Sequence, residues 1–223
     1  MNNRYSERKK EDLIFYLTMN NLPSIKGRFL VAILSSLFLA TCHSTKSINN
    51  YPVSNEKQEK FWEVLKTLCG NTYQGTIVSA PANDTTFKGK TLLMHVRSCE
   101  PARIRIPFFV GDDRSRTWVL TKNEGQLTLK HDHRHKDGTP DSITQYGGRT
   151  PNSGMSTLQM FPADPETTKL LPAAATNVWW IELVPGNYFT YNLRRLGTDR
   201  FFSIRFDISK QVETPEAPWG WKD

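Results

Sequence analysis

Residues 110–148 read VGDDRSRTWVLTKNEGQLTLKHDHRHKDGTPDSITQYGG, and the pattern of this stretch predicts the fold of the whole domain. Residues 116–122 (RTWVLTK) are rich in β-branched and aromatic side chains, which favour an extended strand. The loop Asn123-Glu124-Gly125 follows, and its glycine can adopt the positive φ of a tight turn. A second extended run comes next, so the stretch predicts a β-hairpin.

The second run alternates between apolar and polar residues. Side chains of a strand point to opposite faces in turn, so Leu127, Leu129, His131 and His133 share one face. His135 continues that row if the strand does not bulge. Since two leucines lie on this face, we expect it to be the buried one.

The rest of the chain continues as short extended runs separated by turns. No helical pattern of 10–15 residues falls between them, which argues against parallel βαβ units. The runs are residues 73–79, 91–97, 103–110, 116–122, 126–134, 142–146, 156–161, 178–184, 188–195 and 201–208. This spacing predicts an all-β fold, an antiparallel and mostly up-and-down β-barrel of about 8–10 strands.

Two segments depart from the strand pattern. Residues 162–175 form a long irregular insertion, which we interpret as a short helix or a lid. Residues 214–223 (TPEAPWGWKD) carry two tryptophans, which we expect to dock on the barrel.

An amphipathic helix is predicted at residues 55–68, before the first strand. Asn55 can cap it, with Gln58 three residues later, and Gly70 is a suitable end. Phe61, Val64, Leu65 and Leu68 supply the apolar stripe of this helix. We expect it to pack against the barrel.

The N-terminal region has the pattern of a targeting segment. Residues 29–40 form an apolar run of about a dozen residues, which is too short to span a bilayer. Cys42 follows in a pattern similar to a bacterial lipobox, although Thr41 is unusual before the cysteine. We therefore expect a lipid-anchored cell-envelope protein that contacts the membrane through Cys42, or a secreted protein if Cys42 is not lipidated; an uncleaved anchor is the alternative.

These features predict the domain organisation. Residues 1–41 form the signal segment, with Met19 as an alternative start, and residues 42–54 form a tether. Residues 55–223 form a single barrel domain with its N-terminal helix.

Two cysteines, Cys69 and Cys99, remain beside Cys42. An oxidising compartment would allow a disulfide between them. Two buried free thiols are the alternative, and a catalytic cysteine is less favoured because no histidine partner can be assigned.

The chain of 223 residues has a formal net charge of +7. It contains no Lys/Arg-rich run with interleaved aromatic residues, which argues against a nucleic-acid partner. The serine-hydrolase elbow, the phosphate-binding glycine loop and the HExxH and paired CxxC motifs are also missing.

Four short motifs together resemble a family of bacterial secreted or lipid-anchored proteins. They are GDDRSRTW at residues 111–118, KHDHRH at 130–135, YGG at 146–148 and PWG at 218–220. The resemblance covers roughly residues 61–221 and implies the compartment, but it implies no activity. At the level of fold alone, the series of strands is similar to the calycin class of lipocalins and their relatives, without the lipocalin Gly-x-Trp motif.

The histidine face is the first candidate site. Histidines two residues apart on a strand can converge on one ion, so His131, His133 and His135 are candidate ligands of zinc or another transition metal. A further ligand would come from a neighbouring segment, and Asp112, Asp113, His95 and Glu100 are the candidates. The alternatives are a charged strand end and a polar ligand pocket.

The charged cluster at residues 112–116 is the second candidate. Asp112 and Asp113 are candidate catalytic carboxylates, and Arg114, Arg116 and His95 are candidate ligand-binding residues. The alternative is a turn held by its own hydrogen bonds and salt bridges.

We expect a cell-envelope lipoprotein whose barrel binds a small ligand or has a structural role. A metal-dependent enzyme or metal-binding protein that uses the histidine face is the second hypothesis. A protein-interaction module is the third.

Overall fold

The computed structural model describes residues 55–123 and 125–221. The predicted signal segment, the alternative start Met19, the lipidation site Cys42 and the tether therefore lie outside the described residues. In the described part of the chain, no helix is both long enough and apolar enough to cross a bilayer.

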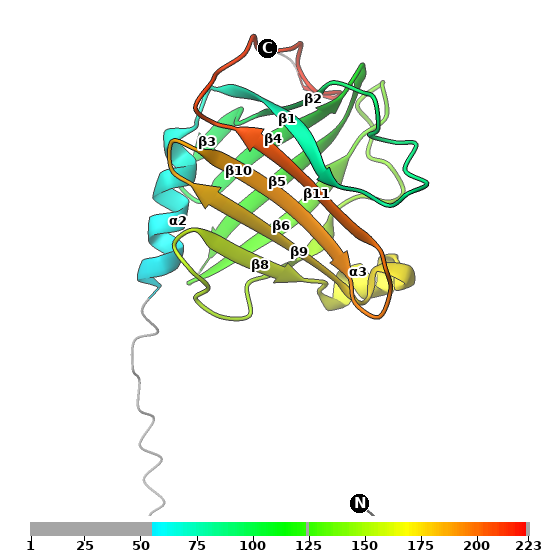
Figure 1. The fold of residues 1–223 in the computed structure, drawn as a ribbon. Coiled ribbons are helices and arrows are strands. Elements are labelled where there is room, and N and C mark those ends of the chain that lie inside the picture. The colour runs from blue at the N-terminus through cyan, green and yellow to red at the C-terminus, as the bar shows by residue number, and fades with distance from the viewer. Residues whose placement is uncertain (1–54, 124, 222–223) are drawn as a thin grey trace, which may run out of the picture. The chain divides into compact units, whose positions relative to one another are not determined.

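The described residues form an antiparallel sheet that curls into a barrel (Figure 1). Its strands are β1 (Thr72–Ser79), β2 (Leu92–His95), β3 (Ser98–Glu100), β4 (Arg103–Val110), β5 (Asp113–Asn123), β6 (Gln126–His133), β7 (Tyr146–Arg149), β8 (Leu158–Pro162), β9 (Asn177–Val184), β10 (Tyr188–Arg195) and β11 (Phe201–Asp207). Most strands pair with the next strand of the chain, in the order β7-β6-β5-β4-β2-β1-β11-β10-β9-β8. The exceptions are β1, which pairs with β11, and β3, which lies off this path and pairs only with β4. The predicted up-and-down barrel is confirmed.

The barrel closes where β7 meets β8. An antiparallel bridge joins Gly148 to Ala163, and the backbone N–H of Asp164 donates to the carbonyl oxygen of Gly147 at 3.0 Å. The backbones approach so closely that a Cβ on Gly148 would lie 1.8 Å from the carbonyl oxygen of Pro162. Gly148 of the YGG motif thus provides the space for closure, whereas Gly147 provides space against Leu129 on β6.

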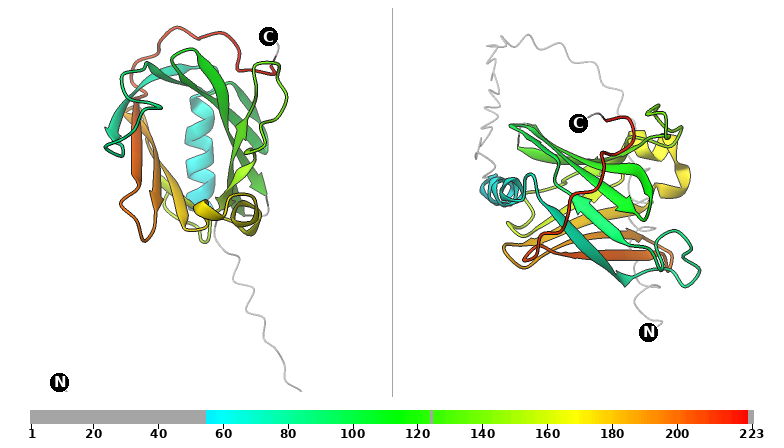
Figure 2. Two further views of the ribbon diagram at one scale, coloured as in Figure 1. Left: turned by 90° about the vertical axis from the view of Figure 1, so that its right-hand side faces the viewer. Right: turned by 90° about the horizontal axis from the view of Figure 1, so that it is seen from above.

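Helix α2 (Glu56–Thr67) lies across one end of the barrel and is seen behind the ring of strands in Figure 2, left. Its buried face brings Phe61, Trp62 and Leu65 into the apolar core. The predicted helix is confirmed, but its predicted capping is wrong. Asn55 makes no side-chain capping bond, and Gln58 turns into the domain, where its Nε2 donates to Thr150 Oγ1 at 2.8 Å.

A disulfide joins Cys69, just after α2, to Cys99 on β3. The pairing expected from the cysteine count is therefore present. Strand β3 itself was not predicted, because its three residues, SCE, are too few to show an alternation of apolar and polar side chains. Through β3 and the disulfide, the end of the helix is fastened to the edge of β4.

The prediction of a strand at residues 142–146 is wrong, because β7 begins only at Tyr146. The preceding segment is a loop that folds on its own side chains: Asp141 accepts from the backbone of Ile143 at 2.9 Å, and Gln145 has a φ of 61°. Such local bonds compete with a strand ladder.

The two irregular segments behave as expected. The insertion forms α3 (Pro165–Leu170) and a short 3-10 helix (Pro172–Ala174), and Asp164 caps α3 by accepting from the backbone of Thr167 at 2.9 Å. In the tail, Trp219 and Trp221 are half-buried. Lys136 lies over the Trp219 ring and Arg105 over the Trp221 ring.

Candidate functional site

A pocket of about 370 Å³ is lined by residues at the end of the barrel opposite α2. The C-terminal end of β5 lies beside the helix, since Lys122 Nζ is 2.6 Å from Glu59 Oε2. The pocket is therefore lined by the opposite end of β5, including Arg116 and Trp118. Loops and turns at this end, including residues 81–87 and the β10–β11 turn, complete it.

The floor of the pocket is aromatic. Trp118 stacks on Phe108 at 4.8 Å and on Tyr191 at 4.4 Å between ring centroids, and Trp179 comes from the neighbouring β9. Flat rings held in this way present rigid walls of large apolar area.

His131 is part of this floor and is 4% exposed. Its Nδ1 lies 3.0 Å from the carbonyl oxygen of Tyr146, which can only accept, so Nδ1 carries the hydrogen. Nε2 then accepts from the Tyr191 hydroxyl at 2.7 Å. Burial lowers the pKa of His131 to about 3, so the ring is neutral at physiological pH.

His133 lies above His131 on the same face and nearer the mouth. Its Nε2 lies 3.1 Å from the hydroxyl of Tyr146, whose ring stacks on His131 at 4.6 Å. Burial and, secondarily, the charge of Arg116 lower the pKa of His133, although nearby aspartates act in the opposite direction. Burial raises the pKa of Tyr146 to about 12, so this pair is also uncharged.

The expectation that His135 shares this face is wrong. Strand β6 ends at His133, and His135 is exposed beyond it. His95 is also outside the pocket, since its Nδ1 lies 2.9 Å from Thr72 Oγ1 on β1.

The predicted metal ligands therefore do not assemble. Within residues 55–123 and 125–221, no three His, Cys, Asp or Glu side chains come together to hold an ion. In addition, both ring nitrogens of His131 already have protein partners.

The charged residues at 112–116 do not form one site. Arg116 lines the pocket and pairs with Asp113, whose pKa is lowered by bonds from Ser115 and Arg116 that outweigh its burial. Arg114 instead pairs with Glu216 of the tail. Asp112 is exposed in the turn. Of the cluster, only Arg116 faces the pocket.

Several pocket residues were not predicted as site residues. They are Tyr146, Trp179, Tyr191, Arg195 and Arg200. The alternation of β9 and β10 contained the signal, because Trp179 shares a face with Ile181, and Tyr191 with Leu193 and Arg195. The strand order needed to place these faces together was not available from the sequence.

The buried neutral His131 predicts a pH dependence of stability. Its pKa is about 3 when folded and about 6.5 when unfolded, so the unfolded chain binds the extra proton as the pH falls through 6.5. Lowering the pH from 7 to 5 should reduce the free energy of unfolding by about 2 kcal/mol through this residue. Urea unfolding at both pH values measures it.

The matched variant is His131→Asn, which removes the titrating ring. His133 acts in the same direction and remains, so we expect a smaller loss between pH 7 and pH 5 in the variant than in the parent. Equal losses in the two proteins would contradict the assignment.

No family model, curated protein or solved structure matches this chain.

Proposed function

We propose that this protein binds a small ligand in the open end of its barrel, and that it does so in the bacterial cell envelope. The pocket of about 370 Å³ carries the proposal. Its volume is at the lower end of the range for small-molecule sites, and its aromatic lining with a few placed polar groups is typical of such sites.

The two ends of the barrel differ in their interior side chains, and this difference supports a ligand-binding site over a gap left by incomplete packing. At the α2 end, Phe61, Trp62 and Leu65 are fully buried and fill the interior. At the other end, the interior carries hydrogen-bonded polar rings, His131 and Tyr191 among them. Because these polar groups bond to one another, they can stay buried beside the cavity and leave its aromatic walls available to a ligand.

A side chain that fills the pocket should abolish binding. Leu193 lines the pocket, and Leu193→Trp should weaken the binding of 1-N-phenylnaphthylamine, a neutral aromatic probe, by about ten-fold or more. The fluorescence of the probe gives the affinity. The matched control is Met160→Trp, because Met160 is 44% exposed on β8.

The control should bind the probe as the parent does, with one site per barrel. Unchanged affinity in Leu193→Trp would place the probe elsewhere, and no binding by the folded parent would reject the proposed site.

The envelope location rests on the sequence of the N-terminal region and is consistent with the disulfide, which oxidising compartments favour. We expect the full chain to fractionate with membranes and Cys42→Ser to move it to the soluble fraction. Mass spectrometry of the mature N-terminus checks the lipid, and a translated peptide from residues 4–8 in cells would contradict the start at Met19. A membrane-bound Cys42→Ser protein would contradict lipid anchoring.

A further inference from the structure

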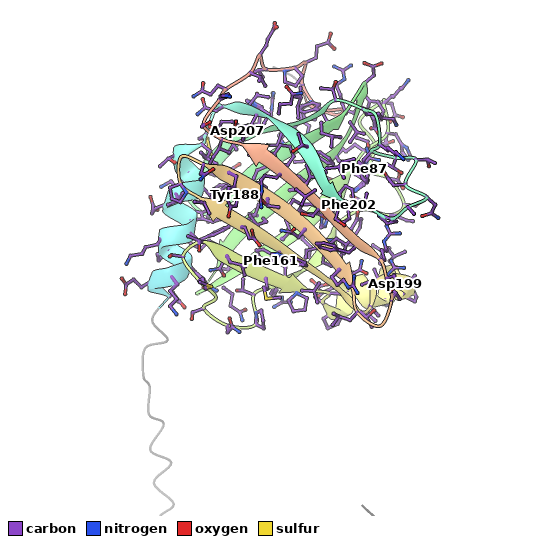
Figure 3. All side chains as sticks on the ribbon, in the orientation of Figure 1. Phe87, Phe161, Tyr188, Asp199, Phe202 and Asp207 are labelled. Carbon is purple, nitrogen blue, oxygen red and sulfur yellow. A yellow bond between two sulfur atoms is a disulfide. The ribbon has the colours of Figure 1, made fainter. Side chains whose placement is uncertain are left out.

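The mouth of the pocket carries three arginines from different parts of the chain. Arg116 comes from β5, Arg195 from the end of β10 and Arg200 from the turn before β11. Figure 3 shows this end of the barrel, where Phe87 and Phe202 lie side by side and Asp199 marks the turn.

These cations are incompletely neutralised. Arg116 pairs with Asp113, whereas Arg195 Nε donates to the neutral Asn177 Oδ1 at 2.9 Å. Among the described residues, neither Arg195 nor Arg200 forms an ion pair with a carboxylate.

Asp84 is the carboxylate that lines the pocket, and its oxygens are already occupied. Its Oδ2 accepts from the backbone N–H groups of Phe87 at 3.1 Å and Lys88 at 3.0 Å, and its Oδ1 accepts from that of Thr86 at 3.3 Å, so the carboxylate holds the β1–β2 loop. The charged side chains that line the pocket are thus three arginines and one aspartate, while Asp113 pairs with Arg116 and Asp141 acts on His133 and Tyr146 from outside the lining.

The neighbouring cations also repel each other. Burial and the charge of Arg200 lower the pKa of Arg195, and the charge of Arg200 is also felt by Tyr146 and Tyr191 of the pocket. An anion placed between the two guanidinium groups would relieve this repulsion and accept charge-assisted hydrogen bonds.

The interior cannot hold that anion, because its polar groups are neutral and its walls are aromatic. His131 has a pKa of about 3 and donates to a backbone carbonyl. Trp118, Tyr191 and Phe108 form a stacked series beside it, which favours a flat apolar body.

We propose that the ligand is a small planar aromatic monoanion, such as a carboxylate, with its ring against the stacked pair Trp118 and Tyr191 and its charged group at Arg195 and Arg200. Arg116 lines the same pocket from β5. This inference rests on the proposed function, since it names the class of ligand for the same pocket.

Two probes with the same ring and nearly the same shape, one an anion and the other neutral, test the proposal. The first is 2-naphthoate and the second is 2-naphthamide, and isothermal calorimetry on the intact mature domain gives both dissociation constants. We expect the carboxylate to bind about ten- to hundred-fold more tightly, as hydrogen bonds to a charged group imply. The globular 1-adamantanecarboxylate should bind more weakly than 2-naphthoate.

The variants locate the charge effect. Arg195→Gln with Arg200→Gln should remove most of the preference for the carboxylate, and Arg200→Gln alone, at an exposed side chain, should reduce it without a risk to folding. The control is Arg205→Gln on the outer face, where Arg205 lies over the Tyr188 ring. It should keep the full preference.

The outcomes separate the two proposals. If 2-naphthamide binds as tightly as 2-naphthoate, or if the arginine variants keep the preference, the anionic ligand is overturned while the pocket remains. If the adamantane compound equals 2-naphthoate, the planar requirement is overturned. If none of the probes binds, including 1-N-phenylnaphthylamine, the proposed function fails and the inference fails with it.

Discussion

Replacing Gly148 by alanine should lower the free energy of unfolding by about 3 kcal/mol, at the upper end of the usual effect of overpacking. The new Cβ would lie 1.8 Å from the carbonyl oxygen and 2.7 Å from the carbonyl carbon of Pro162. These are backbone atoms, so no side-chain rotation relieves the clash. The strands must separate where the bridge from Gly148 to Ala163 closes the barrel.

Chemical denaturation at constant pH measures this effect. The control is Gly186→Ala in the β9–β10 turn, where the new Cβ would meet no atom within 4 Å and only its φ of 69° opposes alanine. It should lose about 1 kcal/mol. A Gly148→Ala protein as stable as this control would show that β7 and β8 do not approach as closely as described.

Loss of the disulfide should lower the free energy of unfolding by about 3–4 kcal/mol in the chain-entropy model. Cys69 and Cys99 are 30 residues apart, and the bond joins the end of α2 to β3. Without it, the unfolded chain gains freedom, while the folded helix keeps the burial of Phe61, Trp62 and Leu65. The double variant Cys69→Ser/Cys99→Ser, unfolded in urea, tests this.

A reductant provides the matched comparison. Dithiothreitol should shift the unfolding midpoint of the parent to that of the double variant and should leave the variant unchanged. Equal midpoints for the parent and the variant without reductant would mean that the bond does not form in solution.

The sequence predicted the barrel well because its strands alternate. Local periodicity gave the bounds of β4 and β10 residue for residue, and it placed His131 and His133 on the inward face. The helix before β1 was also predictable, because its apolar stripe is a local pattern. The disulfide was predictable because only two cysteines remain beside Cys42.

The site was only partly predictable. Its two inward histidines and Arg116 come from the hairpin of β5 and β6, where neighbouring residues in the sequence face each other. Tyr191, Arg195 and Arg200 come from a hairpin more than 50 residues later, and they reach the same pocket because the sheet curls and closes. Arg114 was expected at the same site as Arg116, but it pairs with Glu216 outside the pocket lining, and this partner is distant in the chain.

Alternation along a strand depends on the residues of that strand, so the sequence alone determined which side chains point inward. The closure of β7 on β8, the docking of the tail and the gathering of three arginines at one mouth depend on the order and register of strands far apart in the chain. Long-range packing sets these, because the energy of a contact between distant strands exists only once both strands are in place.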